Sequence, residues 1–229
     1  IEEGFPFSAL SRIIKSMADA AKAAQVQIAG GDLKVVENKA CDGIFINTSG
    51  IGIIPKGVNV SGQGAQAGDN IIINGLIGEH AAAIMSSRQD YRLLTKIKSD
   101  CAPLNGLVAD ILDSCPKIHV MRDPTRGGVA TTLNEIAASS GVQIEIEEKQ
   151  LPLSAAVRGF CEILGIDPLY MANEGKLLVF AREKDTGPVL AAMRKHPLGK
   201  KAAVIGRVTQ KSKPAVLLRT AIGSRRILD

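Results

Sequence analysis

The stretch KIHVMRDPTRGGVATTLNEIAASSGVQIEIE, residues 117–147, shows the local pattern on which the fold depends. Residues 117–122 predict a strand, and residues 124–139 carry apolar side chains at the three-to-four-residue spacing of an amphipathic helix. Residues 142–147 alternate apolar and polar side chains, which is typical of a strand. A strand, a helix and a second strand in succession predict a layered α/β domain.

The rest of the chain continues this alternation. Further helices are predicted at 8–25, 79–88, 103–114, 154–164 and 186–195, and further strands at 26–29, 33–36, 43–54, 71–77, 176–181, 202–208 and 214–219. Residues 55–69 hold four glycines and almost no large apolar side chain, which is typical of a linker. We therefore predict two domains, residues 1–65 and residues 66–229.

The composition excludes several classes of protein. The chain has 229 residues, a net charge of +5 and a pI near 9.1, but aromatic side chains make up only 3% and Trp is absent, so platforms for stacking on nucleic acid are scarce. No apolar run approaches a membrane span and no signal peptide opens the chain, so we expect a cytoplasmic protein without nucleic-acid or membrane partners. Four cysteines without a C-x-x-C pair favour reduced thiols over zinc or disulfides.

The segment Asp-Pro-Thr-Arg-Gly-Gly, residues 123–128, is a candidate anion site because it joins a strand to a helix. Asp123 or Thr125 could cap the helix, and Pro124 suits its first turn. Gly127 and its neighbour let a ligand approach the backbone, Arg126 could contact phosphate oxygens, and the Asp123 carboxylate could hold Mg²⁺. The alternative is a well-capped helix with Arg126 in solvent, and these six residues alone do not decide between them.

Two more turns could carry chemistry. Gly31 and Asp32 follow a predicted strand, with Lys34 two residues later, which would suit a metal and a phosphate side by side. Asn173 and Glu174 precede a predicted strand and could place a general base at the end of a sheet. An ordinary turn is the alternative for both segments. No P-loop and no dinucleotide fingerprint occurs in the sequence.

Five segments of the chain stand in a characteristic order: GDLKVVE at 31–37, DGIFINT at 42–48, DPTRGGVATTLNE at 123–135, ANEGK at 172–176 and HPLG at 196–199. Together they closely resemble the HypE family of [NiFe]-hydrogenase maturation proteins, and the resemblance covers nearly the whole chain. It implies a PurM-like α/β fold with mixed sheets, shared with aminoimidazole ribonucleotide and selenophosphate synthetases. It also implies a homodimer whose first domain binds ATP and is incomplete in residues 1–65.

The resemblance implies an ATP-dependent carbamoyl dehydratase. A carbamoyltransferase, HypF, places a carboxamide on a C-terminal cysteine, ATP drives its dehydration to a thiocyanate, and a HypC-HypD complex is a further partner. The residues implied fall into three roles: Asp32 and Asp123 for Mg²⁺, Gly31, Asp32, Thr125, Arg126 and Gly127 for ATP and its phosphates, and Lys34, Asn173 and Glu174 for catalysis.

Two positions depart from the family pattern. Leu33 stands where the family usually has Thr, and the sequence stops at Asp229 without the terminal cysteine. We expect this piece to be inactive alone. The rival functions are another ATP-using enzyme of the superfamily acting on a small molecule, and a non-catalytic maturation scaffold.

Overall fold

The computed structural model describes residues 1–88, 97–211 and 213–229. The chain divides into two compact units, Ile1–Pro55 and Lys56–Asp229. Within the described residues, no helix is both long and apolar enough to cross a membrane. All four cysteines are free thiols, and burial raises the pKa of the Cys161 thiol.

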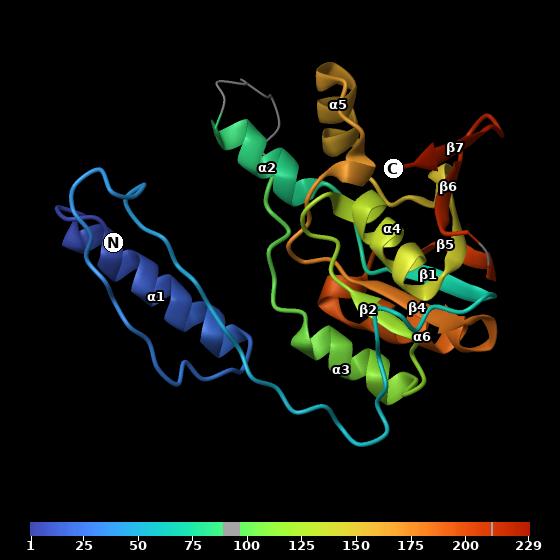
Figure 1. The fold of residues 1–229 in the computed structure, drawn as a ribbon, viewed down its shortest axis with the longest axis horizontal. Coiled ribbons are helices and arrows are strands. Elements are labelled where there is room, and N and C mark those ends of the chain that lie inside the picture. Colours follow the sequence, from blue (N-terminus) through green and yellow to red (C-terminus); the bar gives the residue numbers. More distant parts are fainter. Residues whose placement is uncertain (89–96, 212) are drawn as a thin grey trace. The chain divides into compact units, whose positions relative to one another are not determined.

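The first unit contains one helix, α1 (Phe7–Ala23), and a long extended segment (Figure 1). The segment is fixed to the amino-terminal residues: Ile1 donates a hydrogen bond to the Lys34 carbonyl at 2.8 Å, and Glu2 pairs with Val36 in an isolated parallel bridge. The Glu2 carboxylate accepts the backbone N–H of Gly43 at 3.1 Å. The amino terminus therefore organises the segment by single contacts and not by a ladder.

The strands predicted at 26–29, 33–36 and 43–54 are wrong for this structure, because none of them forms a ladder. Their apolar side chains are instead largely exposed, with Ile51 and Ile53 almost fully so. β-Branched residues favour an extended backbone, but a strand is stable only when a neighbouring strand pairs with it and a core covers one face. Within the first unit, the described residues offer no such neighbour.

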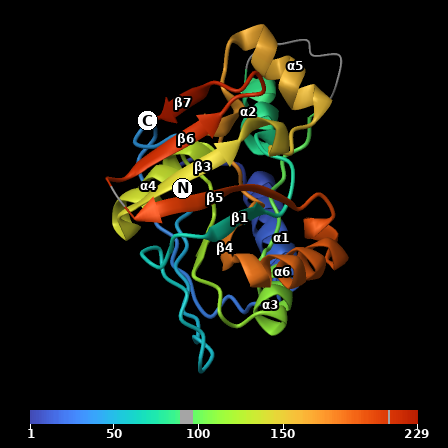
Figure 2. The same cartoon turned by 90° about the vertical axis from the view of Figure 1, so that its right-hand side faces the viewer.

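The second unit is built on a seven-stranded sheet in the order β2-β4-β1-β5-β3-β6-β7, and Figure 2 shows the strands from β7 to β4 side by side. All neighbours are antiparallel except β3 and β6, which are parallel, so the predicted mixed sheet is confirmed. The strands are β1 (Asp69–Ile73), β2 (Val120–Arg122), β3 (Val142–Glu147), β4 (Leu178–Arg182), β5 (Ala203–Lys211), β6 (Ala215–Arg219) and β7 (Arg225–Leu228).

Helices cover both faces of this sheet (Figure 1). Ile71 and Ile73 of β1 face a core shared with α4, whereas Ile72 between them faces a core shared with α3 and α6. Alternate residues of a strand point to opposite faces, so a run of three buried isoleucines indicates a central strand. The helices of this unit are α2 (Glu79–Arg88), α3 (Asn105–Ser114), α4 (Gly128–Ser140), α5 (Ala155–Leu164) and α6 (Glu183–Lys195), with short 3₁₀ turns at Glu148–Gln150, Pro168–Tyr170 and Pro197–Gly199.

Every helix and strand predicted beyond residue 70 is present, although several bounds differ. The strand predicted at 71–77 ends at Ile73, because the Asn74 side chain takes over the hydrogen bonding there. The helix predicted at 124–139 begins only at Gly128. Strand β7 was not predicted, because it is only four residues long and its Ile227 side chain is exposed. It forms by pairing with β6 across the turn from Thr220 to Ser224.

Candidate functional site

The loop before α4 depends on two consecutive left-handed glycines. Gly127 has φ +74° and Gly128 has φ +64°, a conformation that side chains with a Cβ rarely adopt. A Cβ on Gly127 would lie 2.2 Å from the Thr131 hydroxyl, and one on Gly128 would lie 2.5 Å from the Leu169 carbonyl oxygen. The glycines therefore let α4 start directly against the chain around residues 169–171.

The predicted capping of this helix is wrong. Gly127 occupies the N-cap and no side chain caps it, while Asp123, Pro124 and Thr125 precede the helix. The two left-handed glycines turn the chain before the helix begins, which places the carboxylate and the hydroxyl too early to cap it. Both side chains therefore remain available to a ligand.

A pocket of about 490 Å³ lies over this loop and the first turns of α4. It combines a helix amino terminus, two guanidinium groups, two carboxylates and three hydroxyls, a set of groups that suits an anion or a metal-bound anion. The ion pair between Arg122 and Glu135, at 2.7 Å, forms part of its wall. The lining residues are Arg122, Asp123, Thr125, Arg126, Gly127, Thr131, Thr132 and Glu135.

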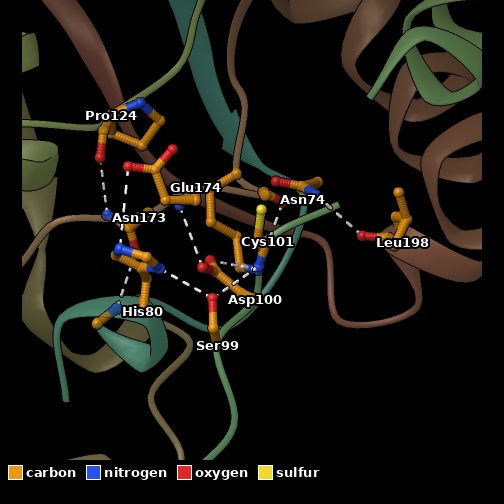
Figure 3. Close-up of polar contacts among 12 residues, drawn as sticks. Asn74, His80, Ser99, Asp100, Cys101, Pro124, Asn173, Glu174 and Leu198 are labelled. Atoms are coloured by element: carbon orange, nitrogen blue, oxygen red, sulfur yellow. Dashed lines mark hydrogen bonds and ion pairs between the residues drawn. The ribbon is translucent and has the colours of Figure 1, made fainter. Parts of the chain in front are cut away.

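Asn173 is buried and connects this loop to two other segments (Figure 3). Its amide donates to the carbonyls of Pro124 at 2.9 Å and Met171 at 3.0 Å, and its Oδ1 accepts the N–H of Gly78 at 2.8 Å. Through these three bonds, both the amide donor group and the carbonyl oxygen of the Asn173 side chain are paired within the protein. The structure thus places Asn173 as a link between the Pro124 loop, the start of α2 and the chain before Glu174.

Glu174 presents its carboxylate beside His80, at the edge of a polar network (Figure 3). Oε1 of Glu174 lies 4.0 Å from Nε2 of His80, whose Nδ1 lies 2.8 Å from the Ser99 hydroxyl. The side chain is 42% exposed, and its backbone N–H donates to Oδ1 of Asp100 at 3.1 Å. An accessible carboxylate on a fixed backbone fits the predicted general base, and that role stays a prediction.

Beneath Glu174 lies an ion pair that the sequence did not predict. Nζ of Lys176 is 2.9 Å from Oδ2 of Asp100, and the two side chains are only 9% and 2% exposed. Oδ2 has no directed hydrogen bond, so the pair is an ionic contact. Lys176 ends the ANEGK segment, which was its one signal in the sequence, whereas Asp100 stands in a loop whose residue pattern gave none.

A second pocket, of about 360 Å³, opens beside this pair and includes Glu79 of α2 and the Lys200 and Lys201 side chains. Burial raises the pKa of Glu79 above its usual 4.5. The nearby Lys176 ammonium lowers this pKa and the Asp100 carboxylate raises it, but burial is the largest effect and the pKa is raised overall. The folded protein therefore binds this proton more tightly than the unfolded chain does.

Glu79→Gln is consequently expected to stabilise the protein at neutral pH. The unfolded chain loses the Glu79 proton first as pH rises above 4.5, so the wild-type protein loses stability between that value and the raised folded pKa. Below pH 4.5 the advantage of the variant should vanish. Urea midpoints across this pH range check the result, with exposed Glu183 in the first turn of α6 as a matched Gln control. A destabilising effect at neutral pH would mean that attraction to Lys176 exceeds the cost of burial.

The remaining predicted residues lie in the first unit. Gly31, Asp32 and Lys34 belong to the extended segment and are exposed. Oδ1 of Asp32 accepts the N–H of Leu33 at 2.8 Å, which leaves oxygen lone pairs of the kind that Mg²⁺ prefers. Asp32 and Asp123 are in different units, and among the described residues no group of three or more His, Cys, Asp or Glu side chains could hold a metal.

Comparison with known proteins identifies the family. The model of the AIR synthase related protein, C-terminal domain, matches residues 66–219, and that of the N-terminal domain matches residues 2–54. Carbamoyl dehydratase HypE of Cupriavidus necator is 48% identical over 229 residues, which are 100% of this chain and 65% of that relative. Carbamoyl dehydratase HypE of Rhodobacter capsulatus is 48% identical and is covered to 67%. The chain belongs to the HypE family.

Solved structures of HypE proteins have the same fold. A HypE-HypF complex contains a chain 49% identical to this one with a TM-score of 0.97, covering 100% of this chain and 74% of that chain. HypE in complex with ATP is 43% identical with a TM-score of 0.96, covering 100% and 70%. The predicted family and its PurM-like fold are therefore confirmed, and the chain spans about two thirds of the length of its HypE relatives.

Proposed function

We propose that the protein containing this chain is an ATP-dependent carbamoyl dehydratase, which converts a thiocarbamate on a C-terminal cysteine to a thiocyanate. The observation that carries the proposal is 48% identity, across all 229 residues, to a protein named carbamoyl dehydratase HypE. The product would supply the cyanide ligand during hydrogenase maturation. The domain boundary near residue 65 belongs to the same proposal.

The proposed chemistry gives each predicted residue a task. An amide oxygen is a poor leaving group, and ATP would supply the phosphoryl group that makes it a good one. Glu174 would then remove the N–H proton, since its carboxylate is accessible and its backbone is fixed. Asn173 would hold the loop that carries it, through its bonds to Pro124, Met171 and Gly78.

Charge on the phosphates would be balanced by the basic residues and the helix amino terminus predicted for this role. We propose that Thr125, Arg126 and Gly127 contact phosphate oxygens from the pocket at the start of α4, and that Lys34 adds a further positive charge. Gly31 would allow close approach of the nucleotide, and Asp32 and Asp123 would offer oxygen ligands to Mg²⁺.

The proposed partners follow from relatives. A HypE protein has been solved with HypF, and we propose HypF as the carbamoyl donor for this protein and a HypC-HypD complex as a further partner. We also propose a homodimer in the cytoplasm. The homodimer is supported by the exposed apolar side chains of the first unit, such as Ile46, Ile51 and Ile53, because exposed apolar side chains that lie together mark surfaces that bind other protein chains.

Intact-mass spectrometry of the full-length natural protein tests the reaction. Incubation with its carbamoyl-transferring partner should add one carbamoyl group to a C-terminal cysteine, and Mg-ATP should then remove one water. Failure to accept the carbamoyl group would favour a small-molecule ATP-using enzyme of the superfamily, and acceptance without ATP-dependent water loss would favour a scaffold.

A further inference from the structure

We propose that Asp100 and Lys176 form a buried positioning pair, which holds the Glu174 carboxylate at the angle that dehydration requires. The inference rests on the proposed role of Glu174 as the base. Neither residue would touch the reacting group; both would act through the backbone that carries Glu174.

The backbone from Glu174 to Leu177 is fixed at successive positions. Asp100 accepts the N–H of Glu174 at 3.1 Å. Asn74 accepts the N–H of Leu177 at 2.8 Å and donates to the Gly175 carbonyl at 3.2 Å. A strand-entry turn that only had to connect two segments would not need a side-chain partner at each of these groups.

The contact between the two segments is also very close. A Cβ on Gly175 would lie 1.8 Å from the carbonyl oxygen of Asp100, so only glycine permits this approach. The stem of Lys176 runs over Gly75, where an added Cβ would be 3.5 Å from its Cε. Backbone packing therefore fixes the distance between the segments, and Asp100 fixes the direction of the Glu174 N–H.

The charges of the pair need an explanation beyond folding. Asn74 shows that a neutral amide can hold this backbone, and it does so without the large desolvation cost of a buried carboxylate and ammonium. Asp100 uses one oxygen for Glu174 and the other for Lys176, so its carboxylate is held in one rotation. The Asp100 carboxylate, which accepts the Glu174 N–H, is thus held by two contacts. A single neutral side chain in place of the pair would hold this acceptor less rigidly.

The pair also controls which charges face the site. The titratable groups around it are Glu79 from α2, Glu174 with the neighbouring His80, and Cys101, Lys200 and Lys201 in the lining of the second pocket. If Asp100 lost its charge, the Lys176 ammonium would lose its direct partner, would keep only the part-buried Glu79 carboxylate nearby, and could draw Glu174 inward. The intact pair leaves the Glu174 carboxylate free to face a substrate beside His80.

The experiment measures single-turnover water loss from the carbamoylated full-length protein. Asp100→Asn keeps an oxygen that can accept the Glu174 N–H but breaks the ion pair, and we expect the rate to fall by about 10-fold to 100-fold, the size of effect produced by a small misplacement of a catalytic group. Carbamoyl acceptance and the KM for ATP should not change. Asp110→Asn on the exposed face of α3 is the matched control.

Two further variants separate positioning from folding. Asp100→Asn combined with Lys176→Gln replaces the ion pair with a neutral hydrogen-bonded pair and should recover most of the rate that the single variant loses. In a Glu174→Gln background, Asp100→Asn should cause no further loss, because a positioning residue acts only through the group it positions.

Each outcome assigns a cause. The positioning role would be overturned if Asp100→Asn lost water at a rate within two-fold of the wild type. It would also be overturned if Asp100→Asn slowed the Glu174→Gln protein by the same factor as it slows the wild type. A wild-type protein that accepts carbamoyl but loses no water with ATP would instead refute the proposed function, and the two failures are distinguishable by the wild-type reaction alone.

Discussion

Glu174→Gln is expected to slow ATP-dependent water loss from the carbamoylated full-length protein by at least about 100-fold, the usual contribution of a positioned general base. Gln has nearly the size of Glu but carries no basic oxygen at neutral pH. The bond that fixes this position runs from the backbone N–H to Asp100, so the substitution leaves the surrounding network in place. Intact-mass spectra taken at successive times after addition of Mg-ATP measure the rate.

The control for this variant is Glu162→Gln, which changes an exposed carboxylate on α5 away from the Asp100 network. Both variants should accept the carbamoyl group as the wild type does, because the partner enzyme performs that step. A Glu174→Gln protein that dehydrates within two-fold of the wild-type rate would remove Glu174 from the mechanism and direct attention to another group in the site.

Local sequence pattern predicted the second unit well, because its elements carry their own signals. The three isoleucines of β1 and the periodic apolar face of α4 indicate a strand and a helix without knowledge of their neighbours. Strand β7 lacks such a signal: its register comes from pairing with β6, and pairing is a property of two segments. The extended segment of the first unit shows the converse, with strong strand propensity and no partner.

The sequence predicted the parts of the candidate site whose charged residues and glycines all stand in one segment. The loop 123–128 carries its charges and glycines together, so its role as an anion site could be proposed, although the left-handed pair of glycines could not. Asp100 is different, because its importance arises only when the fold brings it to Glu174 and Lys176. A buried ion pair between distant segments has no signature in the sequence of either one.

Gly128→Ala is expected to destabilise the second unit by about 2–5 kcal/mol, because it combines two costs. A left-handed conformation costs a residue with a Cβ roughly 1–2 kcal/mol, and overpacking typically adds 1–3 kcal/mol. At Gly128 the new Cβ would lie 2.5 Å from the carbonyl oxygen of Leu169 and 2.6 Å from that of Met171. Both obstacles are backbone atoms, so relief requires the segment that leads to Asn173 to move.

Gly141→Ala isolates the first of these costs, that of the left-handed conformation. Gly141 ends α4 with φ +66°, nearly the value of Gly128, but an added Cβ there would meet no atom within 4 Å. We expect a loss of only about 1–2 kcal/mol for this variant. Urea denaturation of both proteins measures the difference. Equal losses would show that the close approach of α4 to residues 169–171 contributes nothing, whereas a larger loss for Gly128→Ala would establish that this approach holds the start of α4 against the chain leading to Glu174.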